Sequence, residues 1–514
     1  MKLCLFLLSA LLVFTVFPVA SQETDSPAEN EIFVITDFEF NITGRTRPFA
    51  LINEGELRQG EVIRGRENLA AYIRDRTQRL VNQRVLRDTV AITYSIGEQN
   101  EDGSFPVILI IAVEDSWNII ALPYPRYTDN DGFSLTIRAR DYNFFGTMAP
   151  LRIDIGYTFN QYRESSFLFE VYSSTPFRAF GYTWNFRFDN LFWYRPDADE
   201  PFFFQNVTGL SMELPLRITT FTFGFEQSFT LNEENPSWYW KGPNYGEQFQ
   251  SGLFPSTRLF ANLRVPLGIE VSRFGEMTYN AGFSATFNHE FPVAGWELRE
   301  FRRGPFLRFN HSLGFGRIDW RENFRDGVSV SIHNAFNYDF FRHRNNRNPL
   351  SASVSIGATG HFVISEFFGI SARLQYRYWY QHEPMYHDRA GDFLRGIIDN
   401  AMNADHMLSL NMDFPFRVFR FVPSQWLNNR RLSFFDLEFH LSPIFDMALY
   451  RSDPQAGNLM VAVTGGAELI IFSGFMRNLY ARFSLGGNIR ELFRTGELPS
   501  GNNREFSFTL GHFF

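Results

Sequence analysis

From Trp117 to the C-terminus, the chain is a succession of short segments in which apolar and polar residues alternate. Successive side chains of a β-strand point to opposite faces, so each segment predicts a strand with one apolar and one polar face. We count about eighteen such segments by this period of two. With its flanks, each approaches the ~10 residues of a membrane-crossing strand. Examples are Phe133–Ala139, Leu151–Tyr157, Ser166–Tyr172 and Phe221–Gln227.

Aromatic residues make up 18% of the chain, with 61 Phe and 20 Tyr. Outer-membrane barrels place girdles of aromatic side chains at both lipid interfaces. The mean hydropathy is only -0.21, because lumen-facing polar residues offset the lipid-facing apolar ones. Beyond the N-terminal segment there is no apolar run of roughly eighteen residues, so helical spans are not expected. We predict a mainly β fold, a transmembrane antiparallel β-barrel; the alternative is a soluble β-sandwich or propeller with a Phe-rich core.

Residues 1–21 have the pattern of a secretory signal peptide. Lys2 precedes a mostly apolar run, and Val19-Ala-Ser21 supplies small residues for cleavage. Cys4, the one cysteine, lies too early for a lipoprotein site, so the mature chain would carry no disulfide or thiolate chemistry. Residues 22–30 form a short polar linker.

Residues 31–114 read as a small α+β domain, and residues 115–514 as the barrel. The expected order is β-α-α-β-β, with strands at 32–42, 85–96 and 105–113 and helices at 50–60 and 66–83. In the second helix, Leu69, Tyr72, Ile73, Leu80 and Val81 make one apolar face.

The last nine residues alternate and are expected to form the closing strand. Phe506, Phe508, Leu510, His512 and Phe514 fall on one face, and Ser507, Thr509 and Gly511 on the other. Phe514 would then lie at the lipid–water interface. Gly511 weakens this strand, since glycine offers no side chain to pack.

Long polar connections at 190–204, 231–254 and 383–405 alternate with short turns such as Leu216-Arg-Ile218. Outer-membrane barrels have long outside loops and short periplasmic turns. A small periplasmic domain before the first strand and a periplasmic C-terminus require an even number of strands.

Four segments carry a resemblance. They are Arg140-Asp-Tyr-Asn-Phe-Phe-Gly-Thr147, Asp392-Phe-Leu-Arg-Gly-Ile397, Leu410-Asn-Met-Asp-Phe-Pro-Phe416 and Phe434-Phe-Asp-Leu-Glu438. In order and spacing they resemble the BamA/TamA-like outer-membrane assembly factors, in which POTRA (polypeptide-transport-associated) domains precede a bacterial surface antigen barrel. The resemblance implies a sixteen-stranded barrel preceded here by one POTRA domain, and five strands after the loop, from near Met407, Leu432, Leu459, Leu479 and Phe506. Ile397 stands where the family has an aromatic, Asp413 where it has Glu, and Glu438 where it has Gly.

The resemblance also implies that the long loop folds back into the lumen, with Arg395 and Gly396 at its tip. Asn411 and Asp413 would match one strand motif, and Phe434 and Asp436 the next. A guanidinium binds carboxylates through a rigid donor fork, so Arg395 would bridge Asp413 and Asp436. The alternative is that Arg395 is a solvated loop residue and both aspartates merely line a wet lumen.

The function implied is insertion of outer-membrane proteins or translocation of polypeptides. The partners would be unfolded outer-membrane or secreted chains and outer-membrane lipid, and periplasmic lipoproteins could dock on the POTRA domain. The alternatives are a two-partner-type secretion pore and a passive porin or surface structural protein. No catalytic set or cofactor is expected, because the sequence has no Gly-rich phosphate loop and no Gly-x-Ser-x-Gly motif. No metal site is expected at His382 and His387 either, because Pro384 breaks any helix that would align them. A net charge of -8 argues against a nucleic-acid partner.

Overall fold

The computed structural model describes residues 31–512, apart from 84, 88, 130–131, 160–164, 197–201, 217, 232–251, 272–273, 291–303, 341–342, 344–347, 381–387, 390–392, 398–402, 405, 452–458 and 475–478. The expected signal peptide and linker, the His382/His387 pair and Phe514 lie outside the described residues.

A small α+β domain opens the described chain. Its elements are β1 (Ile32–Thr43), α2 (Pro48–Glu54), β2 (Val62–Arg64), α3 (Arg66–Asn82), β3 (Ala91–Ile96) and β4 (Ser104–Glu114). The sheet order is β2-β1-β4-β3, with β1 and β4 parallel and the outer pairs antiparallel. The sequence pattern missed β2, because three residues are too few to show a period.

The helices pack on this sheet through the apolar face that the sequence predicts. Leu69, Ile73 and Leu80 are the buried residues of α3, and they join Leu109 and Ile111 of β4 in one core. Residues three, four or seven apart in a helix share a face, which is why this spacing buries them together. The domain therefore has a hydrophobic core, which Ile120, Tyr142 and Met148 of the barrel extend.

The rest of the chain is a closed antiparallel barrel of eighteen strands. They are β5 (Ile119–Thr128), β6 (Gly132–Asp141), β7 (Leu151–Phe159), β8 (Ser166–Ala179), β9 (Tyr182–Tyr194), β10 (Phe202–Leu216), β11 (Thr219–Leu231), β12 (Leu253–Glu270), β13 (Glu276–Asn288), β14 (Pro305–Arg321), β15 (Phe324–Asp339), β16 (Leu350–Ser365), β17 (Phe368–Tyr380), β20 (His406–Asp413) with β21 (Phe416–Phe421), β22 (Leu437–Arg451), β23 (Met460–Ser473), β24 (Leu479–Asn488) and β25 (Arg504–His512). We count β20 and β21 as one strand, because both pair with β17 and β22.

The prediction of a mainly β antiparallel barrel is thus confirmed, and so is the count of about eighteen alternating segments. The sixteen strands implied by the resemblance are wrong. The connection expected at 190–204 is shorter than predicted, since β9 runs to Tyr194 and β10 resumes at Phe202.

Alternation sets the two faces of the barrel wall. Along β22, every second residue is buried on the lumen side, while the residues that alternate with them are more exposed; the buried ones are Glu438, His440, Ser442, Ile444, Asp446 and Ala448. On the outer face, large apolar side chains are exposed around the whole barrel; they include Ile137, Phe186, Phe225, Leu259, Phe283, Phe309, Phe336, Ile356 and Phe419. An exposed apolar surface of this extent needs an apolar environment.

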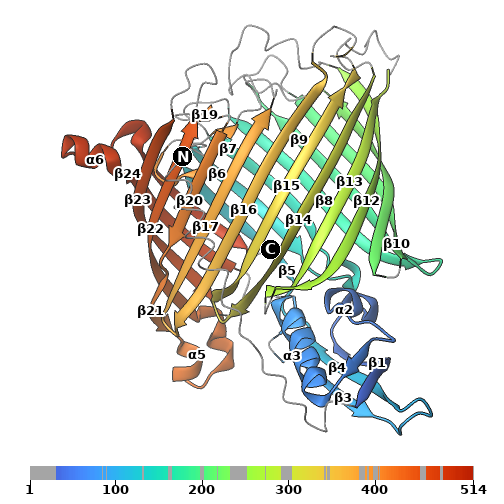
Figure 1. The fold of residues 1–514 in the computed structure, drawn as a ribbon. Coiled ribbons are helices and arrows are strands. Elements are labelled where there is room, and N and C mark those ends of the chain that lie inside the picture. Colours follow the sequence, from blue (N-terminus) through green and yellow to red (C-terminus); the bar gives the residue numbers. More distant parts are fainter. Residues whose placement is uncertain are drawn as a thin grey trace.

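The two ends of the barrel differ (Figure 1). The small domain lies at one end, which we call the domain end; we call the opposite end the far end. Two short helices also mark the ends: α5 (Pro423–Trp426) at the domain end and α6 (Ile489–Thr495) at the far end. Among the described helices, none has the length and apolar character to cross a membrane.

Candidate functional site

The described tip of the long loop, Phe393–Ile397, lies against the inner face of the barrel wall. Leu394 and Ile397 are 2% and 3% exposed and pack with Met407 of β20, Ala448 of β22 and Ala462 of β23. Ile397, which stands where the resemblance has an aromatic residue, is therefore an apolar anchor of the tip. Burial of these side chains holds the loop inside the barrel.

Arg395 makes a fork to the wall beside this apolar contact. Its Nε donates to Oδ2 of Asp446 at 2.9 Å, and its Nη2 donates to Oδ1 at 2.6 Å. Nη1 donates to Asp413 and, at 3.3 Å, to Oε1 of Glu468. The backbone N–H of Arg395 also donates to Asp446, at 2.9 Å. One guanidinium thus bridges β20, β22 and β23.

The carboxylates of this network are removed from solvent. The side chains of Asp446 and Glu468 are 1% and 3% exposed, whereas that of Asp413 is 39% exposed. A second cation, Arg482 of β24, lies 3.6 Å from Glu468. Buried charges require partners of opposite sign. The wall strands supply the carboxylates, and Arg395 of the loop tip supplies the cation that pairs with them.

Gly396 brings the tip into backbone contact with β24. Its φ is +95°, and a Cβ built there would lie 2.3 Å from the backbone N of Gly487. Its N–H donates to Oε2 of Glu505 in β25 at 3.2 Å. Only glycine fits both the dihedral angle and the space. Arg395 and Gly396 together therefore link the loop to five consecutive strands, from β20 to β25.

The structure brings together four of the six residues predicted for the tip and its anchors. Besides Arg395, Gly396 and Asp413, Asn411 takes part, because its Nδ2 donates to the carbonyl of Phe393 at 2.7 Å.

The predicted pairing of Arg395 with Asp436 is wrong. Residues Arg430–Phe435 form a 3₁₀ turn, η9, and Asp436 follows it at the domain end. There Asp436 accepts from the backbone N of Ser424 at 3.1 Å and from its hydroxyl. Phe434 lies on the same turn and is 57% exposed. The expected strand start near Leu432 is also wrong, because β22 begins at Leu437.

Sequence reasoning missed Asp446 and Glu468. Each is the single acid in an apolar stretch of strand, Ile444-Phe-Asp-Met-Ala448 and Gly466-Ala-Glu-Leu-Ile470. An isolated carboxylate at a lumen-facing position of an otherwise apolar strand is the signal that could have found them.

The barrel closes between its first and last strands through a short pairing. β25 and β5 share three residue pairs, Ser507↔Thr128, Phe508↔Tyr127 and Thr509↔Arg126. In contrast, β24 and β25 pair from Leu479↔His512 to Gly487↔Arg504, and β5 and β6 pair along all of β5. Two prolines, Pro123 and Pro125, lie on β5 and cannot donate to a ladder. Among the described junctions this seam has the fewest paired residues.

Within the seam strand, Phe508 packs on Phe483 at a centroid distance of 4.6 Å. Phe506 is 39% exposed and packs on Tyr127 of β5 at 5.9 Å. Leu510 and Gly511 pair with Ala481 and Tyr480 of β24, on the other side of β25.

The turn between β6 and β7 joins the barrel to the small domain. Asn143, 0% exposed, donates from Nδ2 to Thr46 at 2.7 Å and to Asp115 at 3.0 Å. The carbonyl of Gly146 accepts from the N–H of Arg47 at 2.9 Å. Gly146 has φ +75°, and a Cβ there would meet the carbonyl O of Arg45 at 2.1 Å. Asn143 and Gly146, the Asn and Gly of the segment Arg140–Thr147, thus form a close joint between the barrel and the small domain.

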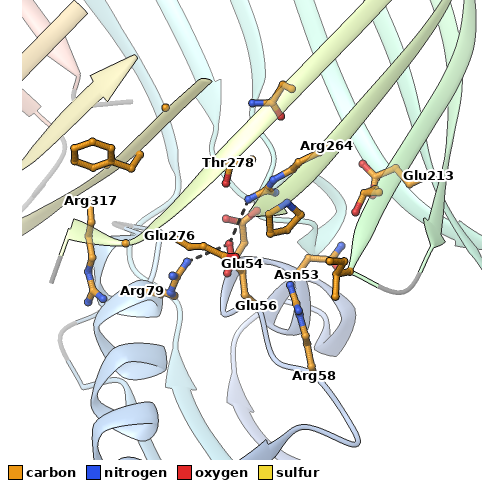
Figure 2. A pocket seen from close by; sticks show the side chains of 18 of the residues that line it. Asn53, Glu54, Glu56, Arg58, Arg79, Glu213, Arg264, Glu276, Thr278 and Arg317 are labelled. Carbon is orange, nitrogen blue, oxygen red and sulfur yellow. Dashed lines mark ion pairs between the residues drawn. The ribbon is translucent and has the colours of Figure 1, made fainter. Parts of the chain in front are cut away.

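A second contact joins α3 of the small domain to β14. Asp75 of α3 pairs with Arg317 of β14, and Asn82 donates to Asp319 at 3.0 Å. A cavity of ≈1250 Å³ opens between the domain and the barrel mouth. Figure 2 shows charged side chains from both parts facing this cavity, among them Glu56, which lies 3.1 Å from Arg79 and 3.9 Å from Arg264.

A further ionic cluster lies on the lumen side at the domain end. Glu438 accepts from Nε of Arg420 and contacts Nε2 of His440, both at 2.6 Å. Glu322, in the turn from β14 to β15, pairs with Arg420 at 2.7 Å and with Arg417. Glu438 stands where the resemblance has glycine. Because Arg420 pairs with both Glu438 and Glu322, it links β22 to the turn between β14 and β15.

Within the described residues, no group of three or more His, Cys, Asp or Glu side chains is arranged to hold a metal ion.

No protein-family model and no curated protein matches the chain. The solved structures similar to it include CdiB from Acinetobacter baumannii, with 12% identity over 94% of this chain and 74% of that one, at a TM-score of 0.47. CdiB from Escherichia coli has 10% identity over 98% and 95%, at 0.41. BamA from Haemophilus ducreyi lacking POTRA domains 1–3 has 11% identity over 93% and 84%, at 0.38. Likeness at this level does not assign the chain to a family.

Proposed function

We propose that the chain is an outer-membrane barrel that inserts or translocates polypeptides, with its small domain in the periplasm as a POTRA domain. Two features support the membrane location. The outer face of the barrel exposes large apolar side chains, and the closed barrel satisfies its backbone hydrogen bonds internally, as a lipid environment demands. The ionic contacts lie on the opposite, lumen side of the wall, so the two faces differ in polarity as a barrel between lipid and a polar lumen requires.

The observation that carries the polypeptide-handling function is the seam. The wall closes through three residue pairs between β25 and β5. The edges of these two strands can therefore separate at low cost, because few backbone hydrogen bonds have to break. Open edges bind other strands. A passive porin gains nothing from a weak junction.

The small domain supplies a second strand edge. β3 is the last strand of its sheet, and among the described strands it pairs with β4 alone. Thr93, Tyr94 and Ser95 are exposed along it. An unfolded client can add a strand to such an edge. The joint at Asn143 and Gly146 fixes this edge relative to the barrel mouth.

The loop tip at Arg395 would keep the strands next to the seam in register. It contacts β20, β22 and β23 through carboxylates and β24 and β25 through Gly396. The wall from β20 to β25 can then act as one unit while the seam opens beside it.

Photo-crosslinkers at Thr93 and Phe508 in intact cells test this proposal. Capture of many barrel precursors at both sites supports a general insertase, and capture of one large secreted chain supports a dedicated secretion pore. A crosslinker at Leu259, on the outer face away from the seam, is the control. No client at Thr93 or Phe508, together with steady ion conductance, would leave the porin alternative.

A further inference from the structure

The connection between β21 and β22 forms a protruding turn at the domain end (Figure 1). It contains α5 and the 3₁₀ turn η9. Four large apolar side chains on it are exposed: Trp426 by 58%, Leu427 by 68%, Phe434 by 57% and Phe435 by 56%. We call these four residues the aromatic foot.

The backbone holds the aromatic foot in this exposed position. Asp436 accepts from Ser424 at 3.1 Å, and its carbonyl accepts from the N–H of Gly474 at 2.7 Å. The N–H of Asn429 donates to the carbonyl of Ser424 at 2.9 Å. The turn is therefore tied to the base of β22 and β23. A turn that is fixed in this way presents its apolar side chains outward instead of folding them onto the wall.

The aromatic foot continues the apolar outer face of the barrel. Trp426 packs edge-on against Phe421, with ring centroids 5.2 Å apart. Phe419, 53% exposed, contacts Phe439 on the neighbouring strand at 6.1 Å. Arg420, between Phe419 and Phe421, points to the other side of the wall, where it pairs with Glu322, as Arg417 does.

We infer that the aromatic foot lies in the phospholipid headgroup layer of the leaflet facing the periplasm and anchors this side of the barrel. The inference rests on the proposed function for the membrane location and orientation. Trp and Phe beside a cation are typical of the lipid–water interface. There the aromatic rings contact the acyl chains, and the cation binds the phosphate groups of the lipids. Arg431, exposed on η9 between the two halves of the foot, supplies such a cation.

Because Cys4 is the one cysteine, nitroxide labels can be attached singly in a Cys4→Ser background. We would label Leu427→Cys and Phe435→Cys in the foot. Leu259→Cys, 51% exposed on β12, is the lipid control, and Val62→Cys, 58% exposed on the small domain, is the water control. The full chain is reconstituted in vesicles of phosphatidylethanolamine and phosphatidylglycerol, and collisions with oxygen and with a water-soluble nickel chelate are measured.

We expect both foot labels to collide with the nickel chelate several-fold less often than the Val62 label. Nickel accessibility equal to that of Val62 at both foot positions, with Leu259 in contact with lipid, overturns the inference while the proposed membrane barrel stands. A water-accessible Leu259 label would instead contradict the proposed function.

A protein partner is the competing occupant, and native membranes distinguish it. Foot labels that are shielded in outer-membrane vesicles but water-accessible in pure lipid vesicles would overturn the lipid assignment. Equal shielding in both preparations supports it.

Discussion

Arg395 donates to both carboxylate oxygens of Asp446, at 2.9 and 2.6 Å, although the two residues are 51 positions apart. This pair fixes the end of a long loop on the inner wall of the barrel. It also replaces the partner that the sequence pattern suggested, Asp436, which lies at the domain end.

Replacement of Arg395 by Leu should destabilise the folded barrel by about 3 kcal/mol or more, because it leaves the buried carboxylate of Asp446 without its cation and leaves Glu468 with Arg482 alone. Urea unfolding of the reconstituted barrel measures the change. Arg373→Leu is the matched control, since Arg373 is exposed and its bond to Asn411 is 3.4 Å long. Equal losses in the two variants would contradict the assigned network.

Gly396→Ala should detach the loop tip, because the added Cβ would meet the backbone of Gly487. Faster proteolysis of the loop, with the barrel still folded, is the expected result. Gly496 has a similar positive φ, +73°, but a Cβ added there would have no atom within 4 Å. Gly496→Ala therefore carries only the backbone strain, of about 1–2 kcal/mol, and should leave the loop intact.

Asp436→Ala should loosen the turn that carries α5 and leave the loop tip in place. Loss of a hydrogen bond to a charged group costs about 1.5 kcal/mol or more. Chymotrypsin should then cut faster near Trp426, while cleavage of the lumenal loop stays unchanged. Asp446→Ala should show the reverse. If Asp436→Ala released the loop, the result would favour a pairing of Arg395 with Asp436 and contradict its assignment to Asp446.

Docking of the small domain on β14 should weaken in acid. Burial alone would raise the pKa of Asp75, but the hydrogen bond from Arg79 and the nearby charges of Arg79, Arg317 and Arg76 outweigh it, so its pKa lies below the ordinary value. A depressed carboxyl pKa gives stabilisation that is complete above the unfolded value of about 3.9 and is lost as the pH falls through the folded value.

The distance between nitroxides at Tyr94 and Ile218, both exposed, reports this docking. We expect a narrow distribution at pH 6 that broadens below roughly pH 4. Asp75→Asn should broaden it already at neutral pH. The control is Asp102→Asn, since Asp102 also has a lowered pKa but bonds to Ser104 within its own turn.

The sequence allowed the strands to be predicted because a wall between lipid and lumen imposes a period of two on every segment. β2 and the helix α5 were missed, since three or four residues show no period, and the seven-residue helix α6 was missed too. The partners of Arg395 were only partly predictable. Asp413 is close to the loop in sequence, whereas Asp446 and Glu468 reach it only because β22 and β23 pair beside β20 and the loop tip lies against all three.

The seam between β5 and β25 tests the central claim most directly. Ser507→Cys with Thr128→Cys places a disulfide across it, and Ser329→Cys with Thr359→Cys places one across the fully paired β15–β16 junction. Insertion of a purified barrel precursor into vesicles that contain the protein is followed by its protease resistance. We predict that oxidation of the seam pair alone stops the assisted insertion and that reduction restores it. Assisted insertion at an unchanged rate with the seam locked would contradict the account.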